Sequence, residues 1–248
     1  MNQRFTSATG EVPGLTTEQM IEVDRAMIED YGIELLQMME NAGRNLAHLA
    51  RTRFLEESPQ GKRVVVLAGR GGNGGGALVC ARRLSNWGAA VEVLLATEPG
   101  VFSDVPAHQL EILKRMQIPI SSPTDTAFPS ASSEVSLIVD GVIGYGLSGP
   151  PRGPASEMIR WANGHPAAVL ALDAPSGVDT ASGEAFDPVV EAAATLTLAL
   201  PKHGLRLRPD LTGELYLADI SVPPGLYEEA LGIEVGPLFA ESEILRLE

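Results

Sequence analysis

The chain has 248 residues, of which 44% are apolar, and a formal net charge of −14. That size and composition allow one large domain with a full hydrophobic core. The acidic balance argues against nucleic acid as a partner, because binding to phosphates needs clustered Lys and Arg. No apolar run approaches the roughly 18 residues of a membrane span, so no membrane partner is expected. Cys80 is the single cysteine, which excludes an internal disulfide and suits a cytoplasmic protein.

The two ends of the chain differ in character from its middle. Residues 1–14 hold one basic residue and no apolar run, so they are expected to form a flexible tail rather than a signal peptide. Residues 15–248 contain no internal repeat and no low-complexity linker, and they are predicted to form a single domain. The acidic end, Glu241 to Glu248, is compatible with either a packed or a free segment.

Two helices are predicted before the first strand. Thr16 and Gln19 have the spacing of a capping box, and an apolar stripe at helical spacing follows them. A second helix is predicted from about residue 34 to residue 54. Glu40 and Asn41 lie beside its apolar face, either as an exposed polar edge or as a polar pair turned into a site.

After Gly61, short apolar runs alternate with helical patterns. The predicted strands cover residues 63–69, 90–96, 135–141, 167–173 and 194–200, with a sixth near 215–220. Helices are predicted at 74–87, 104–116 and 154–164. Short apolar strands separated by helices are typical of a mostly parallel sheet covered on both faces. The predicted fold class is therefore α/β, with two N-terminal helices preceding the sheet.

The most informative stretch is a glycine-rich loop. The predicted strand at 63–69 leads into six glycines within eight positions, Gly69 to Gly76, and a helical pattern follows. Backbone N–H groups at such a helix start lack partners and bind anions, and glycine lets a ligand approach the backbone. The loop matches G-x-G-x-x-G, which is a weak pattern alone, and it lacks the Lys-Ser/Thr of a P-loop. It predicts a phosphate-bearing ligand without fixing a reaction.

Polar residues follow the other predicted strands. Asp140 and Asp173 each end an apolar run, and Ser176 comes shortly after Asp173. Ligands of open α/β sheets bind beyond the carboxyl ends of the strands, so these side chains should converge. A buried carboxylate is costly unless it is paired, so each aspartate is interpreted as a loop cap, a cation ligand or an acid/base group. The candidates for positive potential near an anion are Arg70, Arg82, Arg83 and Lys202.

Five short segments follow one another in a characteristic order. They are Met38 to Gly43, Gly69 to Gly76, Val139 to Leu147, Asp173 to Asp179 and Pro201 to Leu205. Each resembles a motif of the YjeF N-terminal domain family, the NAD(P)HX epimerases. The family motifs are an LMENAG-like helix, G-P-G-N-N-G-G-D-G, V-D-A-x-x-G-T-G-L, D-I-P-S-G-L-D and P-K-x-G-L. Order and spacing agree over nearly the whole chain.

The resemblance implies a three-layer α/β/α Rossmann-like domain that forms a homodimer. The implied activity is epimerisation of the (R) and (S) forms of hydrated NADH and NADPH (NADHX and NADPHX). The implied role is metabolite repair, coupled to a separate NAD(P)HX dehydratase because the chain ends before such a domain could fit. A bound potassium ion, K+, is implied as well.

The resemblance also assigns roles to residues of the matching motifs. Asn73, Asp140 and Ser176 would be potassium ligands. Asp173 would contact the hydrated nicotinamide ring and assist loss and re-addition of its C6 hydroxyl as an acid/base group. The residues implied to line the phosphates and the ribose are Gly72, Asn73, Gly74, Gly75, Gly76, Gly144, Tyr145, Gly146, Leu147, Ser148, Gly149 and Pro150.

Some positions depart from the family motifs. The glycine loop loses one asparagine, and Gly76 replaces the aspartate. Tyr145 replaces the threonine of G-T-G. Two alternatives therefore stay open. One is a catalytically inactive YjeF N-terminal-type domain that serves as a ligand-binding or scaffold module. The other is an ordinary NAD-dependent oxidoreductase, which is supported only by the G-x-G-x-x-G match and Glu98.

Overall fold

The computed structural model describes residues 5–7, 12–102, 104–124, 128 and 134–247. The strands in this part of the chain are β1 (Thr6–Ser7), β2 (Arg63–Ala68), β3 (Ala90–Leu95), β4 (Ile120–Ser121), β5 (Leu137–Gly141), β6 (Val169–Leu172), β7 (Ala194–Leu198), β8 (Glu214–Ala218) and β9 (Ile244–Arg246). They form a nine-stranded sheet in the order β1-β9-β8-β7-β6-β5-β2-β3-β4. Neighbouring strands run parallel except β8 and β9, which are antiparallel.

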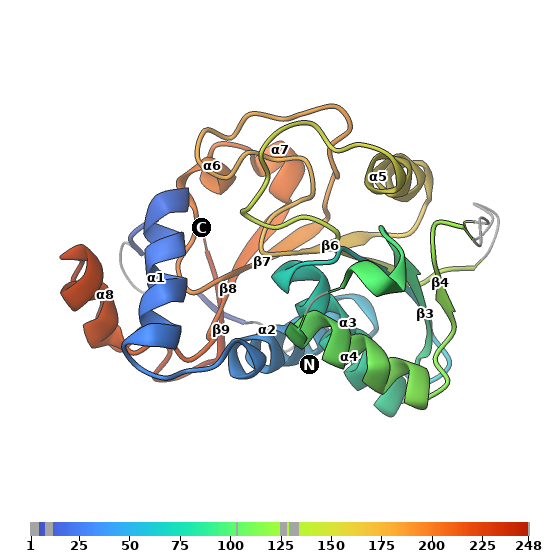
Figure 1. Ribbon diagram of the computed structural model, residues 1–248, viewed down its shortest axis with the longest axis horizontal. Coiled ribbons are helices and arrows are strands. Elements are labelled where there is room, and N and C mark those ends of the chain that lie inside the picture. The colour runs from blue at the N-terminus through green and yellow to red at the C-terminus, as the bar shows by residue number, and fades with distance from the viewer. Residues whose placement is uncertain (1–4, 8–11, 103, 125–127, 129–133, 248) are drawn as a thin grey trace.

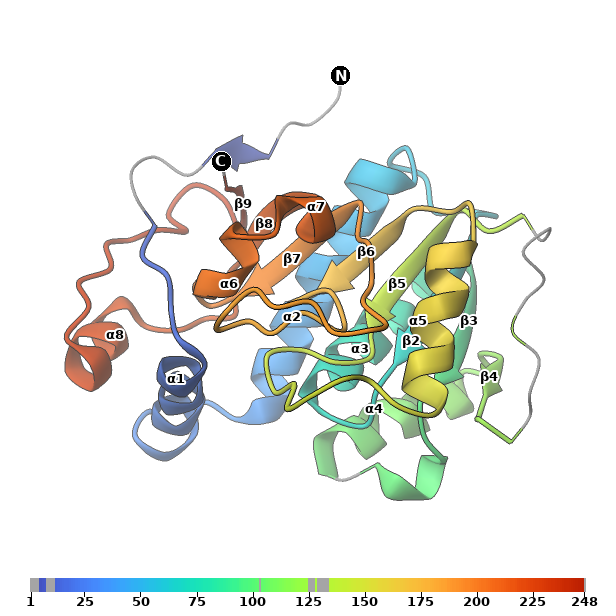
Figure 2. The same ribbon diagram turned by 90° about the horizontal axis from the view of Figure 1, so that it is seen from above.

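Helices cover both faces of this sheet. They are α1 (Thr17–Glu29), α2 (Leu35–Leu49), α3 (Gly72–Asn86), α4 (Asp104–Arg115), α5 (Pro154–Gly164), α6 (His203–Arg206), α7 (Pro209–Thr212) and α8 (Pro224–Leu231). Helices α2, α3 and α4 lie on one face and α5, α6 and α7 on the other, while α1 and α8 lie side by side at one end (Figure 1). The turned view looks onto the sheet, with α5, α6 and α7 on its near side (Figure 2). Among the described helices, none has the length and apolar content to cross a membrane.

The central strands are apolar on both faces because both faces are covered. On β2, Val64 and Val66 join the cluster that includes Leu78 of α3. The alternate residues, Val65 and Leu67, join the opposite cluster around α5. Successive strand residues point to opposite faces, so a strand buried on both sides reads as a continuous apolar run. The predicted three-layer α/β/α class is confirmed.

The predicted elements occur at the expected places, with shifted ends. The capping box forms, with Thr16 N donating to Gln19 Oε1 (2.9 Å) and Gln19 N donating to Thr16 Oγ1 (3.2 Å). The helix predicted over 34–54 is not one α-helix, since α2 gives way to a π-helical turn at Ala50–Phe54. In that turn Leu55 N donates to Ala50 O (3.1 Å). The wider turn keeps both residues of this bond in the core.

Both ends of the described chain join the sheet at one edge. Within the segment predicted to be a flexible tail, β1 pairs with β9, and the Phe5 ring lies 5.3 Å from the Tyr216 ring between centroids. The rest of that prediction, residues 1–4 and 8–11, lies outside the described residues. The acidic C-terminal segment is packed, because β9 pairs with β8. Short edge strands of two or three residues are too brief for an alternating pattern to reveal them.

Candidate active site

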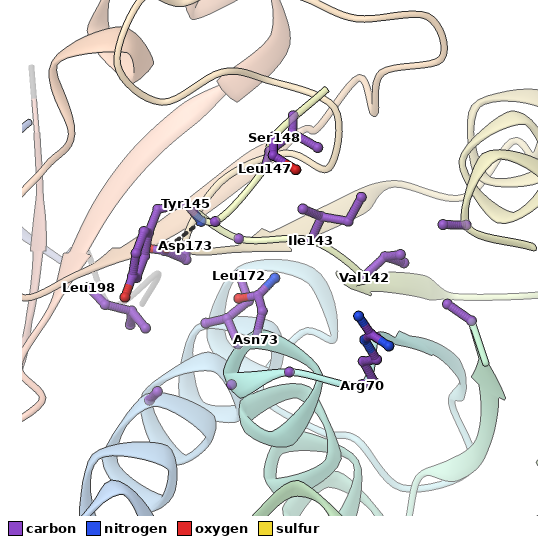
Figure 3. A pocket seen from close by; sticks show the side chains of 18 of the residues that line it. Arg70, Asn73, Val142, Ile143, Tyr145, Leu147, Ser148, Leu172, Asp173 and Leu198 are labelled. Atoms are coloured by element: carbon purple, nitrogen blue, oxygen red, sulfur yellow. Dashed lines mark hydrogen bonds between the residues drawn. The ribbon is translucent and has the colours of Figure 1, made fainter. Parts of the chain in front are cut away.

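A pocket of about 990 Å³ opens at the carboxyl ends of β2, β5, β6 and β7 (Figure 3). This is the edge at which parallel sheets present their loops to ligands. Most residues with an implied substrate role line it. They are Gly72, Asn73, Gly144, Tyr145, Gly146, Leu147, Ser148, Gly149, Pro150 and Asp173.

Three glycines of the glycine-rich stretch lie outside the pocket. Gly74, Gly75 and Gly76 are buried in α3 and do not line the pocket. A side-chain carbon at Gly75 would lie 2.6 Å from Met39 Sδ, and one at Gly76 would lie 2.8 Å from Leu172 Cδ2. Gly75 and Gly76 therefore let α3 pack close to α2 and β6, and the substrate contact implied for Gly74, Gly75 and Gly76 stays a prediction.

The start of α3 is open to the pocket. Gly71 is the N-cap residue and makes no side-chain capping bond, and Gly71 and Gly72 both line the pocket. A side-chain carbon at Gly71 would meet no atom within 4 Å. The first N–H groups of a helix lack intrahelical partners and carry partial positive charge. This end of α3 can accept a phosphate or another anion.

Asp140 is buried between two loops and does not line the pocket. Its Oδ1 accepts hydrogen bonds from Val142 N (3.1 Å) and Ser176 Oγ (2.7 Å), and its Oδ2 accepts one from Ser176 N (2.8 Å). Burial raises the pKa of Asp140, and these hydrogen bonds oppose the rise. The carboxylate thus ties the loop after β5 to the loop after β6.

Asp173 faces the pocket and is paired with a cation. Its Oδ1 accepts a hydrogen bond from Lys202 Nζ, and its Oδ2 accepts one from Tyr145 N (3.1 Å). Lys202 is fully buried and also donates to Leu198 O (3.1 Å). Asp173 has φ +64°, a left-handed conformation that aspartate tolerates better than most residues. An oriented carboxylate beside an ammonium group is suited to proton exchange and to stabilising a cation.

Asn73 is the one implied ligand whose polar atoms are unpaired. Both its Oδ1 and its Nδ2 are buried, and neither has a hydrogen-bond partner among the described residues. The amide points from the start of α3 toward the loop after β5 (Figure 3). A side-chain carbon at Gly144 would lie 3.3 Å from Asn73 Oδ1 and 3.1 Å from Asp173 Oδ2, so Gly144 allows the two side chains to approach. A buried amide without partners indicates a position where a ligand completes the bonding.

The four cations predicted to attract an anion divide into two groups. Arg82 and Arg83 pair with Glu40, at 2.6 Å and 3.8 Å, and do not line the pocket. Lys202 lines the pocket, but it pairs with Asp173. Arg70 lines the pocket and has no ion pair with the described residues. Arg70 is therefore the predicted cation that remains available to a ligand.

The structure also shows the contacts of other residues whose role the sequence left open. Glu40 and Asn41 do not enter the pocket: Glu40 binds Arg82, and Asn41 Nδ2 donates to Ile220 O (3.5 Å). Cys80 is buried, and burial raises the pKa of its thiol. It packs in the core as a small apolar residue.

Sequence reasoning missed two charged residues that line the pocket, Asp24 and Arg152. Asp24 Oδ2 accepts a hydrogen bond from the Tyr145 hydroxyl (2.5 Å). A signal was present, because Asp24 interrupts the apolar stripe formed by Met20 and Val23 on α1. A carboxylate on the buried face of a helix needs a partner. Arg152 gave no such signal, since it lies outside the segments that match the family motifs.

Comparison with known proteins finds a matching family and several relatives. Residues 35–204 match the family model described as "YjeF-related protein N-terminus". An NAD(P)H-hydrate epimerase of Dehalogenimonas lykanthroporepellens is 44% identical over 235 residues, covering 93% of this chain and 91% of the relative. A bifunctional NAD(P)H-hydrate repair enzyme Nnr of Salinibacter ruber is 36% identical, and the match covers 88% of this chain but 42% of that protein.

A solved structure shows the same fold. The crystal structure of yeast ynu0 has a TM-score of 0.80 and 24% sequence identity, and the match covers 95% of this chain and 100% of the yeast chain. The five motifs and the family model indicate the same family, and the pocket lies at the strand ends where these motifs meet. The chain belongs to the family of proteins related to the YjeF N-terminus.

Proposed function

We propose that this chain is an NAD(P)H-hydrate epimerase that interconverts (R)- and (S)-NAD(P)HX in metabolite repair. The observation that carries the proposal is the Asp173–Lys202 pair, which is held at the pocket beside the open start of α3. Relatives named NAD(P)H-hydrate epimerase that align over most of their length support it. The helix start and Arg70 suit the phosphates of a dinucleotide.

The chemistry follows from the placement of Asp173. The carboxyl group passes a proton to the C6 hydroxyl, the C–O bond breaks, and water leaves while the ring nitrogen supplies its electron pair to form an iminium cation. Water then adds to the other face of C6 and returns a proton to the carboxylate. Lys202 donates a hydrogen bond to Asp173 Oδ1 and so orients the carboxyl group. A nearby carboxylate also stabilises the cationic intermediate electrostatically.

A potassium ion fits this site through Asn73. Its unpaired buried oxygen is a hard donor, as are the oxygens of Asp140 and Ser176, and hard oxygen donors suit such cations. Within the described residues, no group of three or more His, Cys, Asp or Glu side chains could hold a metal ion. Asn73, Asp140 and Ser176 would hold the ion, which would supply positive charge close to the anionic substrate. In the structure Asp140 and Ser176 are bonded to each other.

The cellular setting is proposed on the same basis. The names of the bifunctional relatives describe repair enzymes with two activities, and this chain spans less than half of their length. We propose that the epimerase works with an NAD(P)HX dehydratase in the cytoplasm and that it forms a homodimer.

A coupled assay tests the proposed reaction. Purified protein is mixed with (R)-NADHX and an excess of an (S)-specific dehydratase, and recovery of NADH is followed against the spontaneous rate. Acceleration that disappears in Asp173→Asn establishes the epimerase and its carboxylate. Stabilisation by K+ and NADPH without acceleration would instead favour a ligand-binding module, because thermal shifts report binding without turnover.

A further inference from the structure

Asp24 and Tyr145 join two distant parts of the chain at the wall of the pocket. Asp24 lies on α1 and Tyr145 lies in the loop after β5, 121 residues away. The Tyr145 hydroxyl donates to Asp24 Oδ2 at 2.5 Å, and both residues line the pocket. Burial raises the pKa of Asp24, and the hydrogen bond from Tyr145 opposes the rise.

The backbone of Tyr145 contacts the carboxylate to which we assign the reaction. Tyr145 N donates to Asp173 Oδ2 (3.1 Å), and Lys202 takes the other oxygen. Lys202 Nζ lies 5.7 Å from the centroid of the Tyr145 ring. Tyr145 therefore reaches α1 with its side chain and Asp173 with its backbone, as Figure 3 shows for the bond to Asp173.

We propose that Asp24 and Tyr145 form a positioning pair for Asp173. The phenol is anchored on α1, and this anchor holds the loop so that the Tyr145 N–H stays on Asp173 Oδ2. The inference rests on the proposed epimerase function, because it takes Asp173 as the reacting group. The pair is a feature of this chain rather than of the motif it resembles. The motif has threonine here, and its hydroxyl, one bond from Cβ, falls far short of the reach of a phenol.

The loop needs such an anchor because of its composition. Gly144 and Gly146 flank Tyr145, and Gly149 follows with φ +150°. Glycine gives a backbone more freedom than other residues and supplies no side chain to fix it. On the side toward β5, Ile143 N donates to Ser176 Oγ (2.8 Å). The Tyr145 side chain extends this attachment to the far side of the pocket.

The test removes the anchor while keeping the ring. Tyr145→Phe loses the hydroxyl, Asp24→Ala loses the acceptor, and Asp24→Asn keeps an oxygen that can accept the same bond. The matched control is Tyr31→Phe, since the hydroxyl of Tyr31, two residues after the end of α1, also donates to a carboxylate, that of the exposed Glu229 (2.9 Å), away from the pocket. Thermal unfolding verifies that each variant is folded.

Kinetics and loop exchange give independent measurements. We expect Tyr145→Phe and Asp24→Ala each to lower kcat about tenfold, the size of a lost orienting bond, while KM changes less than about twofold. Asp24→Asn should restore most of kcat, and Tyr31→Phe should match the parent protein. Amide hydrogen exchange in peptides covering residues 142–150 should be faster in the first two variants only.

The two measurements separate this proposal from the epimerase assignment. Unchanged loop exchange in Tyr145→Phe and Asp24→Ala overturns the anchor, whether or not the parent protein turns over. Faster exchange with unchanged kcat overturns the positioning role. If the parent protein shows no epimerase activity but the loop exchanges faster in both variants, the anchor stands and the proposed function fails.

Discussion

Asp140 and Asp173 start from the same sequence pattern and reach opposite environments. Each ends a run of apolar residues, and each is buried at the carboxyl end of a strand, β5 or the adjacent β6. Asp140 is bonded by neutral donors alone, two backbone N–H groups and one hydroxyl. Asp173 is bonded by an ammonium group and faces the pocket.

The difference shows that the surrounding groups give two aspartates at similar positions different roles. A carboxylate surrounded by neutral donors holds loops together, and burial raises its pKa. A carboxylate that shares its environment with a cation and opens on a cavity can exchange a proton with a ligand. The same residue type at equivalent strand ends therefore ties two loops together in one place, where it is also a proposed potassium ligand, and is proposed to be catalytic in the other.

Among the substitutions that test this difference, the largest effect is expected at Asp173. Asp173→Asn keeps the size of the side chain but removes its acid/base function, so we expect epimerisation to slow by about 10³-fold. The coupled recovery of NADH measures the rate. Asp210→Asn, which alters a carboxylate paired with Arg208 on the surface at 2.7 Å, should leave the rate unchanged. A normal rate in Asp173→Asn, with the fold intact, would assign the chemistry to another residue.

Removal of Lys202 should convert Asp173 into an unpaired buried charge. We expect Lys202→Gln to destabilise the fold by about 3–5 kcal/mol, because breaking one partner of a buried ion pair leaves the other uncompensated. Urea denaturation measures the loss. The matched control is Lys62→Gln, whose partner Glu56 is exposed (3.0 Å). That surface pair should contribute at most about 1 kcal/mol. Equal losses of unfolding free energy in the two variants would contradict this distinction between a buried and an exposed ion pair.

Substitution of Asp140 should lower the stability of the fold. An asparagine at this position has one oxygen fewer to accept bonds, so one of the N–H or O–H donors now facing Asp140 meets an amide N–H instead. We expect Asp140→Asn to lose about 1–3 kcal/mol of unfolding free energy. Asp179→Asn is the control, because its Oδ1 accepts from Ala181 N (2.8 Å) and Ser182 N (2.9 Å) in an exposed loop. A loss no larger than in this control would show that burial does not strengthen the Asp140 bonds.

Asn73 should show the smallest effect on the protein alone and a clear effect with potassium. Its amide has no partner among the described residues, so Asn73→Ala removes no protein hydrogen bond. In the parent protein, K+ at a hundredfold excess over Kd should stabilise by about 2.7 kcal/mol, and the variant should lose most of this gain. Choline chloride at equal ionic strength controls for salt effects.

A second asparagine controls the potassium experiment. Asn45 is also buried, but its Nδ2 donates to Asp219 O (2.7 Å). Asn45→Ala should destabilise the protein equally in both salts and keep the potassium-dependent shift. A shift that survives in Asn73→Ala would remove this residue from the proposed ligands.

Sequence patterns predicted the central fold well and the site in part. The interior strands and the helices between them were predicted correctly because their apolar patterns are local and long enough to read. The close packing at Gly75 and Gly76 was not predicted, because a glycine for close packing and a glycine for ligand access look alike in a sequence. The pairing of Asp24 with Tyr145 could not be predicted, since α1 and the loop meet only in the folded chain.

The sequence by itself determined the order of strands and helices, the glycine-rich loop and the positions of Asp140 and Asp173 at strand ends. These features depend on periodicity and on residues close along the chain. The tertiary structure alone decided which of the two aspartates faces the pocket, that Lys202 is bound to Asp173, and that Asn73 stays unpaired. Burial, ion pairing and unpaired polar atoms depend on which segments the parallel sheet brings together. Residues that meet in this way are far apart in the sequence, so local patterns do not reveal their contacts.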